Sequence, residues 1–149
     1  MKGSPGAHAI DISSTVRRLN ISRIRVRGAA VATLKAERVR EAMISITFVG
    51  RAAMSDLNGR YLGHKGVTDV ISFGLGRIGK RGAVVGDIYI CPEVARDNAR
   101  RQGVPAGQEL LRLVIHGTLH VLGYEHPDAS SRTESDMWRK QERILARVI

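Results

Sequence analysis

The amino-acid sequence predicts a single globular domain that contains both helices and strands. With 149 residues, the chain can bury roughly 70% of its unfolded surface around one core. Its apolar fraction of 43% and its charged fraction of 26% are ordinary for globular proteins. Short β-branched runs alternate with longer segments whose apolar residues recur at helical spacing. We therefore expect residues 1–149 to form one unit.

The first half of the chain contains two strand patterns and two helix patterns. Residues 1–9 are expected to be a flexible start, because glycine and proline interrupt them and they lack apolar periodicity. Polar and apolar residues alternate over 23–27, which predicts a half-buried strand with a basic outer face. An Ala-rich stretch with one apolar helical face follows, and then a β-branched strand at 44–49 and a short helix at 52–61.

Two further strands flank a glycine-rich segment. Residues 69–73 and 87–91 are rich in β-branched and aromatic side chains, so both are predicted strands. The segment between them, 74–86, carries five glycines and three basic residues. This composition predicts a mobile loop.

The last part of the chain is predicted to be helical. Pro92 suits the first turn of a helix that continues to residue 102. A broad apolar stripe covers residues 108–122, and Gly123 supplies a stop for that helix. Residues 131–148 show helix-like apolar spacing among charged residues, which predicts an amphipathic helix that closes the fold.

The net charge of +10, from 24 basic and 14 acidic residues, indicates a polyanionic partner. Between residues 17 and 40 there are eight basic residues and one acid, which can form either a nucleic-acid surface or a solvated face. A single cysteine, Cys91, and the lack of a secretory apolar segment predict a cytoplasmic location. Apolar runs are too short for a membrane span, so a membrane protein is not expected.

Three histidines predict a metal site. His116 and His120 are one helical turn apart, so both rings project from the same face. Gly123 ends the helix, and the turn after it can bring His126 back to the same point. Three imidazoles with an open fourth position are the pattern of catalytic zinc. The alternatives are capping or core histidines, or a closed structural site completed by Cys91 or by the carboxylate at position 128.

The residue next to the first histidine argues against one class of enzyme. In His-Glu-x-x-His metalloproteases a glutamate follows the first histidine and acts as the general base, whereas Gly117 stands here. A zinc deaminase is also disfavoured, because no His-x-Glu with a Cys-x-x-Cys is present. A metal that activates water, combined with the basic charge, favours phosphodiester hydrolysis.

The eleven residues 116–126, His-Gly-Thr-Leu-His-Val-Leu-Gly-Tyr-Glu-His, resemble the signature of the bacterial YbeY endoribonucleases, also called rRNA maturation factors. Leu57-Asn58, the segment 68–73 and the strand 86–91 resemble three further blocks of that family. The resemblance covers roughly residues 44–128. It implies an α+β fold with a small mixed sheet.

The same resemblance implies a zinc ion held by His116, His120 and His126, with His116 also catalytic. It implies cleavage of single-stranded RNA, in 16S rRNA 3′-end maturation and ribosome quality control, with rRNA in ribosomal subunits as the partner. Many members carry a functional arginine at the position of Leu62; Arg60 is the candidate to replace it as a catalytic and RNA-binding residue.

Other polar residues near the motifs have two interpretations each. Lys65 is a candidate RNA contact, with surface solvation as the alternative. Asp69 and Asp87 are predicted either to orient a ligand histidine or to form turns. The leading functional hypothesis is a zinc-dependent endoribonuclease. The alternative is a non-catalytic, basic ribosome- or RNA-binding protein with a structural zinc.

Overall fold

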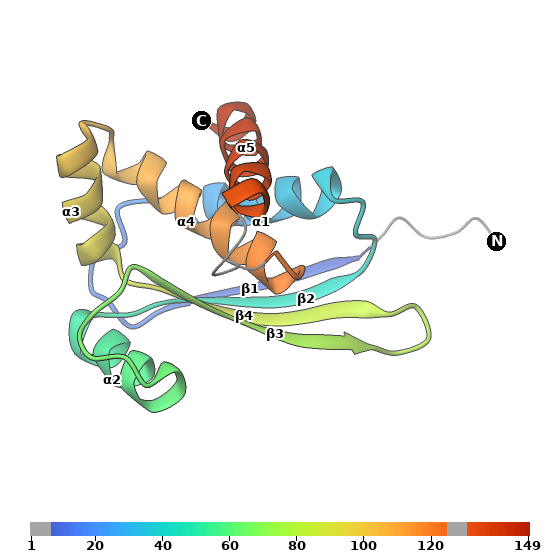
Figure 1. Cartoon of the computed structure of the whole chain (residues 1–149), viewed down its shortest axis with the longest axis horizontal. Coiled ribbons are helices and arrows are strands. Elements are labelled where there is room, and N and C mark those ends of the chain that lie inside the picture. The colour runs from blue at the N-terminus through green and yellow to red at the C-terminus, as the bar shows by residue number, and fades with distance from the viewer. Residues whose placement is uncertain (1–6, 125–130) are drawn as a thin grey trace.

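The computed structural model describes residues 7–124 and 131–149. A sheet forms one layer, and three helices lie on one side of it, two of them packed on the sheet and the third packed on those two (Figure 1). These helices are α1 (Arg23–Ala36), α4 (Ala106–Val121) and α5 (Ser131–Val148). Helix α2 (Arg51–Leu62) lies on the opposite face, and α3 (Pro92–Gln102) packs against α4 at one end.

The sheet is mixed, as the family resemblance implies, and the fold is α+β. Its strands are β1 (His8–Ser14), β2 (Ala42–Phe48), β3 (Val70–Ile78) and β4 (Ala83–Ile90), in the order β1-β2-β4-β3. Strands β1, β2 and β4 are parallel, and β3 runs antiparallel to β4 at the edge. The predicted strands at 44–49, 69–73 and 87–91 and the predicted helices at 52–61, 92–102, 108–122 and 131–148 are confirmed within a few residues.

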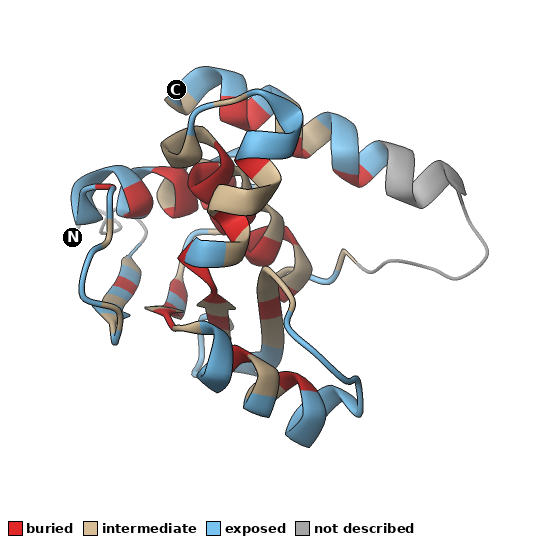
Figure 2. Ribbon diagram, turned by 90° about the vertical axis from the view of Figure 1, so that its left-hand side faces the viewer, coloured by how far each residue is buried: buried red, intermediate tan, exposed pale blue. Residues whose placement is uncertain are grey.

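Two apolar clusters hold the layers together. The larger lies between the sheet and the helical layer and contains buried residues of α1, α4 and α5; Figure 2 colours buried residues red. The smaller lies under α2 and contains Val49, Met54, Ile71 and Cys91. Cys91 is fully buried there.

The prediction of a strand at 23–27 is wrong, because these residues open α1. Ser22 caps the helix, its side chain accepting a hydrogen bond from the Arg25 backbone N–H at 3.1 Å. On a helix, residues two apart project in nearly opposite directions. Val26 is therefore buried while Ile24 is 83% exposed. Five alternating residues were too short a pattern to separate the two structures.

The expectation of a flexible start fails for its last residues, while residues 1–6 lie outside the described part of the chain. His8 begins β1 and pairs with Ala42, and its Nε2 lies 2.8 Å from the Val39 carbonyl oxygen. Much of this strand is polar and exposed, so the local sequence carries only a weak apolar signal.

Arginines of α1 bind the outer edge of β1. Arg23 donates to the carbonyl oxygen of Ile12, and Arg27 donates to those of Ile10, at 3.2 Å, and His8, at 3.3 Å. These carbonyl groups belong to alternate residues and point away from β2. Two arginines of the basic segment 17–40 thus donate hydrogen bonds to the carbonyl oxygens at the open edge of β1. Without such partners, an open edge can pair with a strand of another chain.

The predicted loop at 74–86 is instead a hairpin. Strand β3 continues to Ile78 and β4 begins at Ala83, with an irregularity in the ladder between Gly74 and Arg77. Gly76 and Gly79 have φ values of 88° and 75°, a region that other residues rarely adopt. The glycines therefore serve the bulge and the turn. In the described part of the chain, no helix has the length and apolarity that crossing a bilayer requires.

Helix α4 lies very close to the sheet because glycines stand at the contact. A Cβ atom on Gly117 would lie 2.8 Å from Cγ2 of Ile88 and 3.1 Å from Oγ of Ser72. A Cβ atom on Gly86 would overlap the γ-methyl groups of Val121. The helix can approach β3 and β4 only while both positions lack a side chain.

We predict that Gly117→Ala lowers the free energy of unfolding by about 1–3 kcal/mol, since the added methyl meets a stiff β-branched neighbour. Gly28→Ala is the matched control, because a Cβ there has nothing within 4 Å. Alanine is the better helix former, so the control should gain up to about 1 kcal/mol. Urea unfolding measures both; equal effects would contradict close packing at residue 117.

Candidate active site

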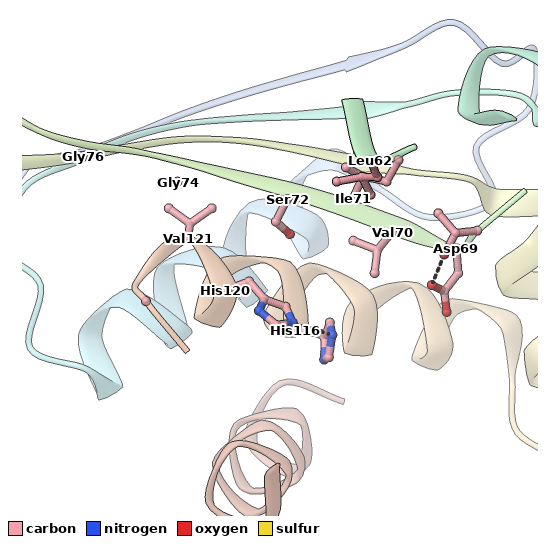
Figure 3. Close-up of a pocket in the computed structure, with 12 residues that line it drawn as sticks. Leu62, Asp69, Val70, Ile71, Ser72, Gly74, Gly76, His116, His120 and Val121 are labelled. Carbon is pink, nitrogen blue, oxygen red and sulfur yellow. Dashed lines mark hydrogen bonds between the residues drawn. The ribbon is translucent and has the colours of Figure 1, made fainter. Parts of the chain in front are cut away.

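Helix α4 brings two of the predicted ligands together. The Nε2 atoms of His116 and His120 lie 3.1 Å apart, and their ring centroids are 4.6 Å apart at an interplanar angle of 76°. Both rings are partly buried beside β3, as Figure 3 shows. The four-residue spacing therefore directs both Nε2 atoms to the same point.

This spacing of nitrogen atoms is compatible with ligation of one ion. Zinc–nitrogen bonds of about 2.0–2.1 Å at tetrahedral angles place two ligand nitrogens roughly 3.3 Å apart. Imidazole also suits copper, iron and nickel. His116 and His120 can thus hold a transition-metal ion as two of its ligands.

The third predicted ligand, His126, lies outside the described residues. Within 7–124 and 131–149, no group of three or more His, Cys, Asp or Glu is placed to hold a metal ion. Cys91 is fully buried in the cluster under α2, so it remains an apolar core residue. The carboxylate at 128 also lies outside the described part.

The orientation of His116 is fixed by Gln141 of α5. Its Nδ1 lies 2.7 Å from Oε1 of Gln141, and Nε2 of Gln141 donates to a carboxylate oxygen of Glu142 at 3.0 Å. Since a carboxylate only accepts, the amide oxygen of Gln141 must face the histidine. The His116 proton then lies on Nδ1, and the lone pair of Nε2 points into the site.

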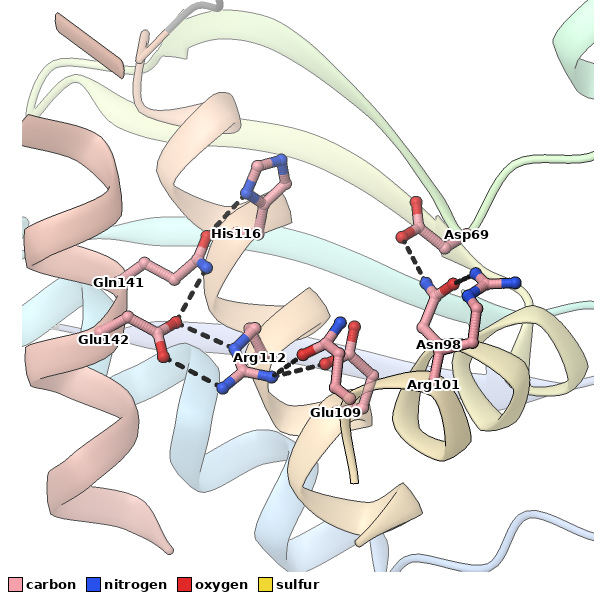
Figure 4. A network of polar contacts seen from close by, with 9 residues as sticks. Asp69, Asn98, Arg101, Glu109, Arg112, His116, Gln141 and Glu142 are labelled. Atoms are coloured by element: carbon pink, nitrogen blue, oxygen red, sulfur yellow. Dashed lines mark hydrogen bonds and ion pairs between the residues drawn. The ribbon is translucent and has the colours of Figure 1, made fainter. Parts of the chain in front are cut away.

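Gln141 is held in turn by a charged network (Figure 4). Arg112 pairs with Glu142 at 2.9 Å and 3.0 Å and with Glu109 at 2.6 Å. Burial raises the pKa of Glu109 more than the hydrogen bond from Arg112 lowers it. Burial acts in the same direction on Glu142, but hydrogen bonds from Arg112 and Gln141 outweigh it and lower the pKa of Glu142. The network links α4 to α5 behind the histidines.

The histidines open into a cleft of about 640 Å³ between α4 and β3. Its described lining combines apolar side chains with backbone groups and the hydroxyls of Thr68 and Ser72, and it has Asp69 as its one carboxylate and no lysine or arginine. The end of α2 closes one side with Leu62 (Figure 3). The basic charge of the chain therefore lies outside the described walls of the cleft.

The free edge of β3 also lines the cleft. The Asp69 carbonyl oxygen accepts from the Cys91 backbone N–H at 2.9 Å, so odd-numbered residues of this segment bond to β4. In an antiparallel pair, residues alternate between bonding the partner and pointing away from it. Val70, Ser72 and Gly74 therefore direct their backbone N–H and C=O groups to the open edge, and all three line the cleft.

Gly117 faces the sheet. Ile88 and Ser72 occupy the space that a side chain at residue 117 would need. A glutamate at this position would therefore require α4 to move away from the strands. The sequence argument against a His-Glu-x-x-His peptidase thus has a packing reason.

The other predicted site residues are less close to the histidines. Arg60 is on α2, 64% exposed at its side chain, and forms an ion pair with Asp56 at 3.3 Å. Lys65 is exposed in the segment after α2. Neither lines the cleft, so their roles in RNA binding stay predictions.

The two aspartates expected to orient a histidine have other partners. Asp69 accepts a hydrogen bond from Asn98 at 3.0 Å, and Asp87 accepts one from Ser45 at 2.7 Å. The residue that orients His116 is Gln141, which the sequence reasoning missed. The sequence does contain one indication of this role: Gln141 is a polar residue four positions after Met137, on the otherwise apolar face of α5. In the structure its side chain is buried, with 2% of the residue exposed.

Comparison with known proteins shows the family to which the chain is similar. The family model Endoribonuclease YbeY matches residues 11–149. The chain is 40% identical over 112 residues to a protein of Beutenbergia cavernae named Endoribonuclease YbeY, covering 70% of this chain and 73% of that protein. It is 34% identical over 138 residues to one of the same name from Frankia alni, covering 85% and 75%.

Among solved structures, a Thermotoga maritima protein determined in solution has a TM-score of 0.61 and 25% sequence identity, covering 93% of this chain and 88% of that one. The fold and the family match thus extend over nearly the whole chain. The chain belongs to the YbeY family of endoribonucleases, and an endoribonuclease acts on RNA.

Proposed function

We propose that this chain is a zinc-dependent endoribonuclease that cleaves single-stranded RNA in the cleft between α4 and β3. The observation that carries the proposal is the pair of Nε2 atoms 3.1 Å apart at that cleft. When bound, such an ion supplies a water molecule of lowered pKa and an electrophile for a phosphoryl oxygen. His126 is the proposed third ligand.

The chain's own groups position the ion and the RNA. Gln141 accepts from Nδ1 of His116, which leaves Nε2 as the ring nitrogen that can bind a metal. The backbone N–H groups of Ser72 and Gly74 at the open edge of β3 are donors of the kind that bind phosphate oxygens. Val70 and Val121 give the cleft an apolar wall beside these polar groups.

Arg60 is proposed to bind a phosphate at the rim of the cleft. It lies in the last turn of α2, the helix whose final residue, Leu62, lines the cleft. Its ion pair with Asp56 is solvent-exposed, and such pairs contribute little free energy. The side chain can therefore leave Asp56 for RNA. Lys65, in the exposed segment that follows, is proposed as a second contact.

The cellular role that we propose is 16S rRNA 3′-end maturation and ribosome quality control in the cytoplasm. The motif at 116–126 and the net charge of +10 support it. Purified chain should cut precursor 16S rRNA near its 3′ end, and EDTA should stop the cleavage. Cleavage that continues in a metal-free preparation would contradict the proposed mechanism.

His116→Ala and His120→Ala should each reduce bound zinc from about one ion per chain toward zero and abolish RNA cleavage, because each removes one ligand. His64→Ala is the control for loss of an exposed imidazole and should keep its metal. Elemental analysis and a cleavage assay measure the two effects. Wild-type metal content in both ligand variants would refute ligation by α4.

Gln141→Leu should weaken zinc binding by about 10- to 100-fold, the usual effect of removing a group that orients a ligand histidine. The double variant Gln141→Glu, Glu142→Gln keeps an acceptor for Nδ1 of His116 and a donor–acceptor pair between residues 141 and 142, so it should restore most of the affinity. Competition with a chelating dye gives the zinc affinity of each variant. Equal affinities in the wild type and Gln141→Leu would show that Gln141 is only a packing residue.

A further inference from the structure

A second hollow adjoins the histidine cleft on its α3 and α5 side. It has a volume of about 310 Å³ and shares His116, Asp69 and Val70 with the cleft. We call it the side pocket and define it by Asp69, Asn98, Gln102, Glu109, Arg112 and Trp138. A group bound in it would lie directly beside the metal site.

The charges of the side pocket favour a neutral ligand over a phosphate. Two carboxylates, Asp69 and Glu109, line it against one guanidinium, Arg112. That guanidinium is already bound by Glu109 at 2.6 Å and by Glu142 at 2.9 Å. A phosphate would meet unbalanced negative charge, whereas a neutral ligand would not.

An aromatic ring stands at the border of the side pocket. Trp138 is the only tryptophan of the chain, and it is 56% exposed although its neighbour Met137 is buried. Bases of single-stranded RNA are commonly bound by stacking on such rings. An exposed indole beside a nuclease site is therefore suited to hold a base.

Other polar groups that line the side pocket have hydrogen-bonding capacity left. Asp69 accepts hydrogen bonds from Asn98 at 3.0 Å and from Thr68 at 3.5 Å, but a carboxylate has about four acceptor positions. The oxygen of the Gln102 amide accepts from Arg112 at 3.3 Å, which leaves its NH₂ group as a donor. Figure 4 shows Asp69 and Asn98 on one side of α4 and Gln141 on the other.

We propose that the side pocket binds one nucleobase of the RNA, with Trp138 stacking on the base and Asp69 accepting from its exocyclic amino group. Cytosine, adenine and guanine carry such a group, whereas uracil has none, and its one ring donor, N3–H, lies between two carbonyl oxygens that a carboxylate repels. The side pocket therefore selects against uracil. This inference rests on the proposed function, because it takes RNA as the ligand of the adjoining cleft.

The test is a binding titration of the full chain with 2′-O-methyl hexanucleotides of cytidine or of uridine, with metal and in EDTA. Hexacytidylate should quench the emission of the single tryptophan and bind several-fold more tightly than hexauridylate. A hexamer of abasic residues, which keeps the phosphates, should not quench. Equal quenching by the abasic hexamer would overturn the proposal.

Variants separate stacking from hydrogen bonding. Trp138→Ala should weaken hexacytidylate binding about ten-fold, as measured by anisotropy of the labelled oligonucleotide. Trp138→Phe keeps a ring and should lose less. Asp69→Asn should bring the affinities for cytidine and uridine together. Ile24→Ala, which shortens an exposed apolar side chain on α1, should bind as the wild type does.

The outcomes distinguish the side pocket from the proposed function. If the wild type cleaves RNA but Trp138→Ala binds it equally well, the base site is wrong and the nuclease function stands. A wild type that shows the expected tryptophan response but cleaves no RNA with any metal would support the base site and refute the function. A change of oligomeric state in Trp138→Ala with unchanged RNA affinity would assign this surface to protein contact instead.

Discussion

The close contact between α4 and the sheet determines the rest of the site. Gly117 and Gly86 stand where a side chain would separate the layers, and their absence of Cβ atoms brings the helix against β3 and β4. That approach sets His116 and His120 beside the open edge of β3. The same contact occupies the position at which a metalloprotease carries its glutamate base. Tight packing and a built-in base at residue 117 thus exclude each other.

The orientation of His116 also depends on α5, which packs against α1 and α4. Gln141 is buried among apolar residues of that helix, and its amide is fixed between His116 and Glu142. Arg112 then ties Glu142 to α4. Partly buried ion pairs add little net stability, because the desolvation of both charges offsets their attraction. We therefore infer that the network serves to orient the imidazole of His116. A purely apolar contact between α4 and α5 would not fix that orientation.

Sequence patterns predicted the elements whose signal is local and long. The stripe at 108–122 spans four turns, and the runs at 44–49 and 87–91 consist of β-branched and aromatic residues. Where the deciding contact is distant, the prediction failed. Residues 23–27 alternate in polarity, but the cap at Ser22 and the core decide for a helix. Strand β1 is stabilised by arginines that approach from α1, which no pattern within 8–14 reveals.

The same division applies to the site. The spacing of His116 and His120 is a property of one helix, so their convergence could be predicted. The position of Gln141 depends on how α5 packs, and only its polarity on an apolar face indicated a role. Arg60 and Lys65 lie on the exposed region at and after α2, where sequence cannot distinguish a solvated charge from a phosphate contact.

The distribution of charge separates attraction of RNA from its recognition. The excess of +10 creates a field that concentrates a polyanion around the whole molecule and is screened within about 8–10 Å at physiological salt. No lysine or arginine is among the described residues that line the histidine cleft. Added salt should therefore weaken the approach of RNA more than its fit in the cleft. In the proposed function, the choice of the bond that is cut then depends on short-range contacts with His116, His120 and the open backbone of β3.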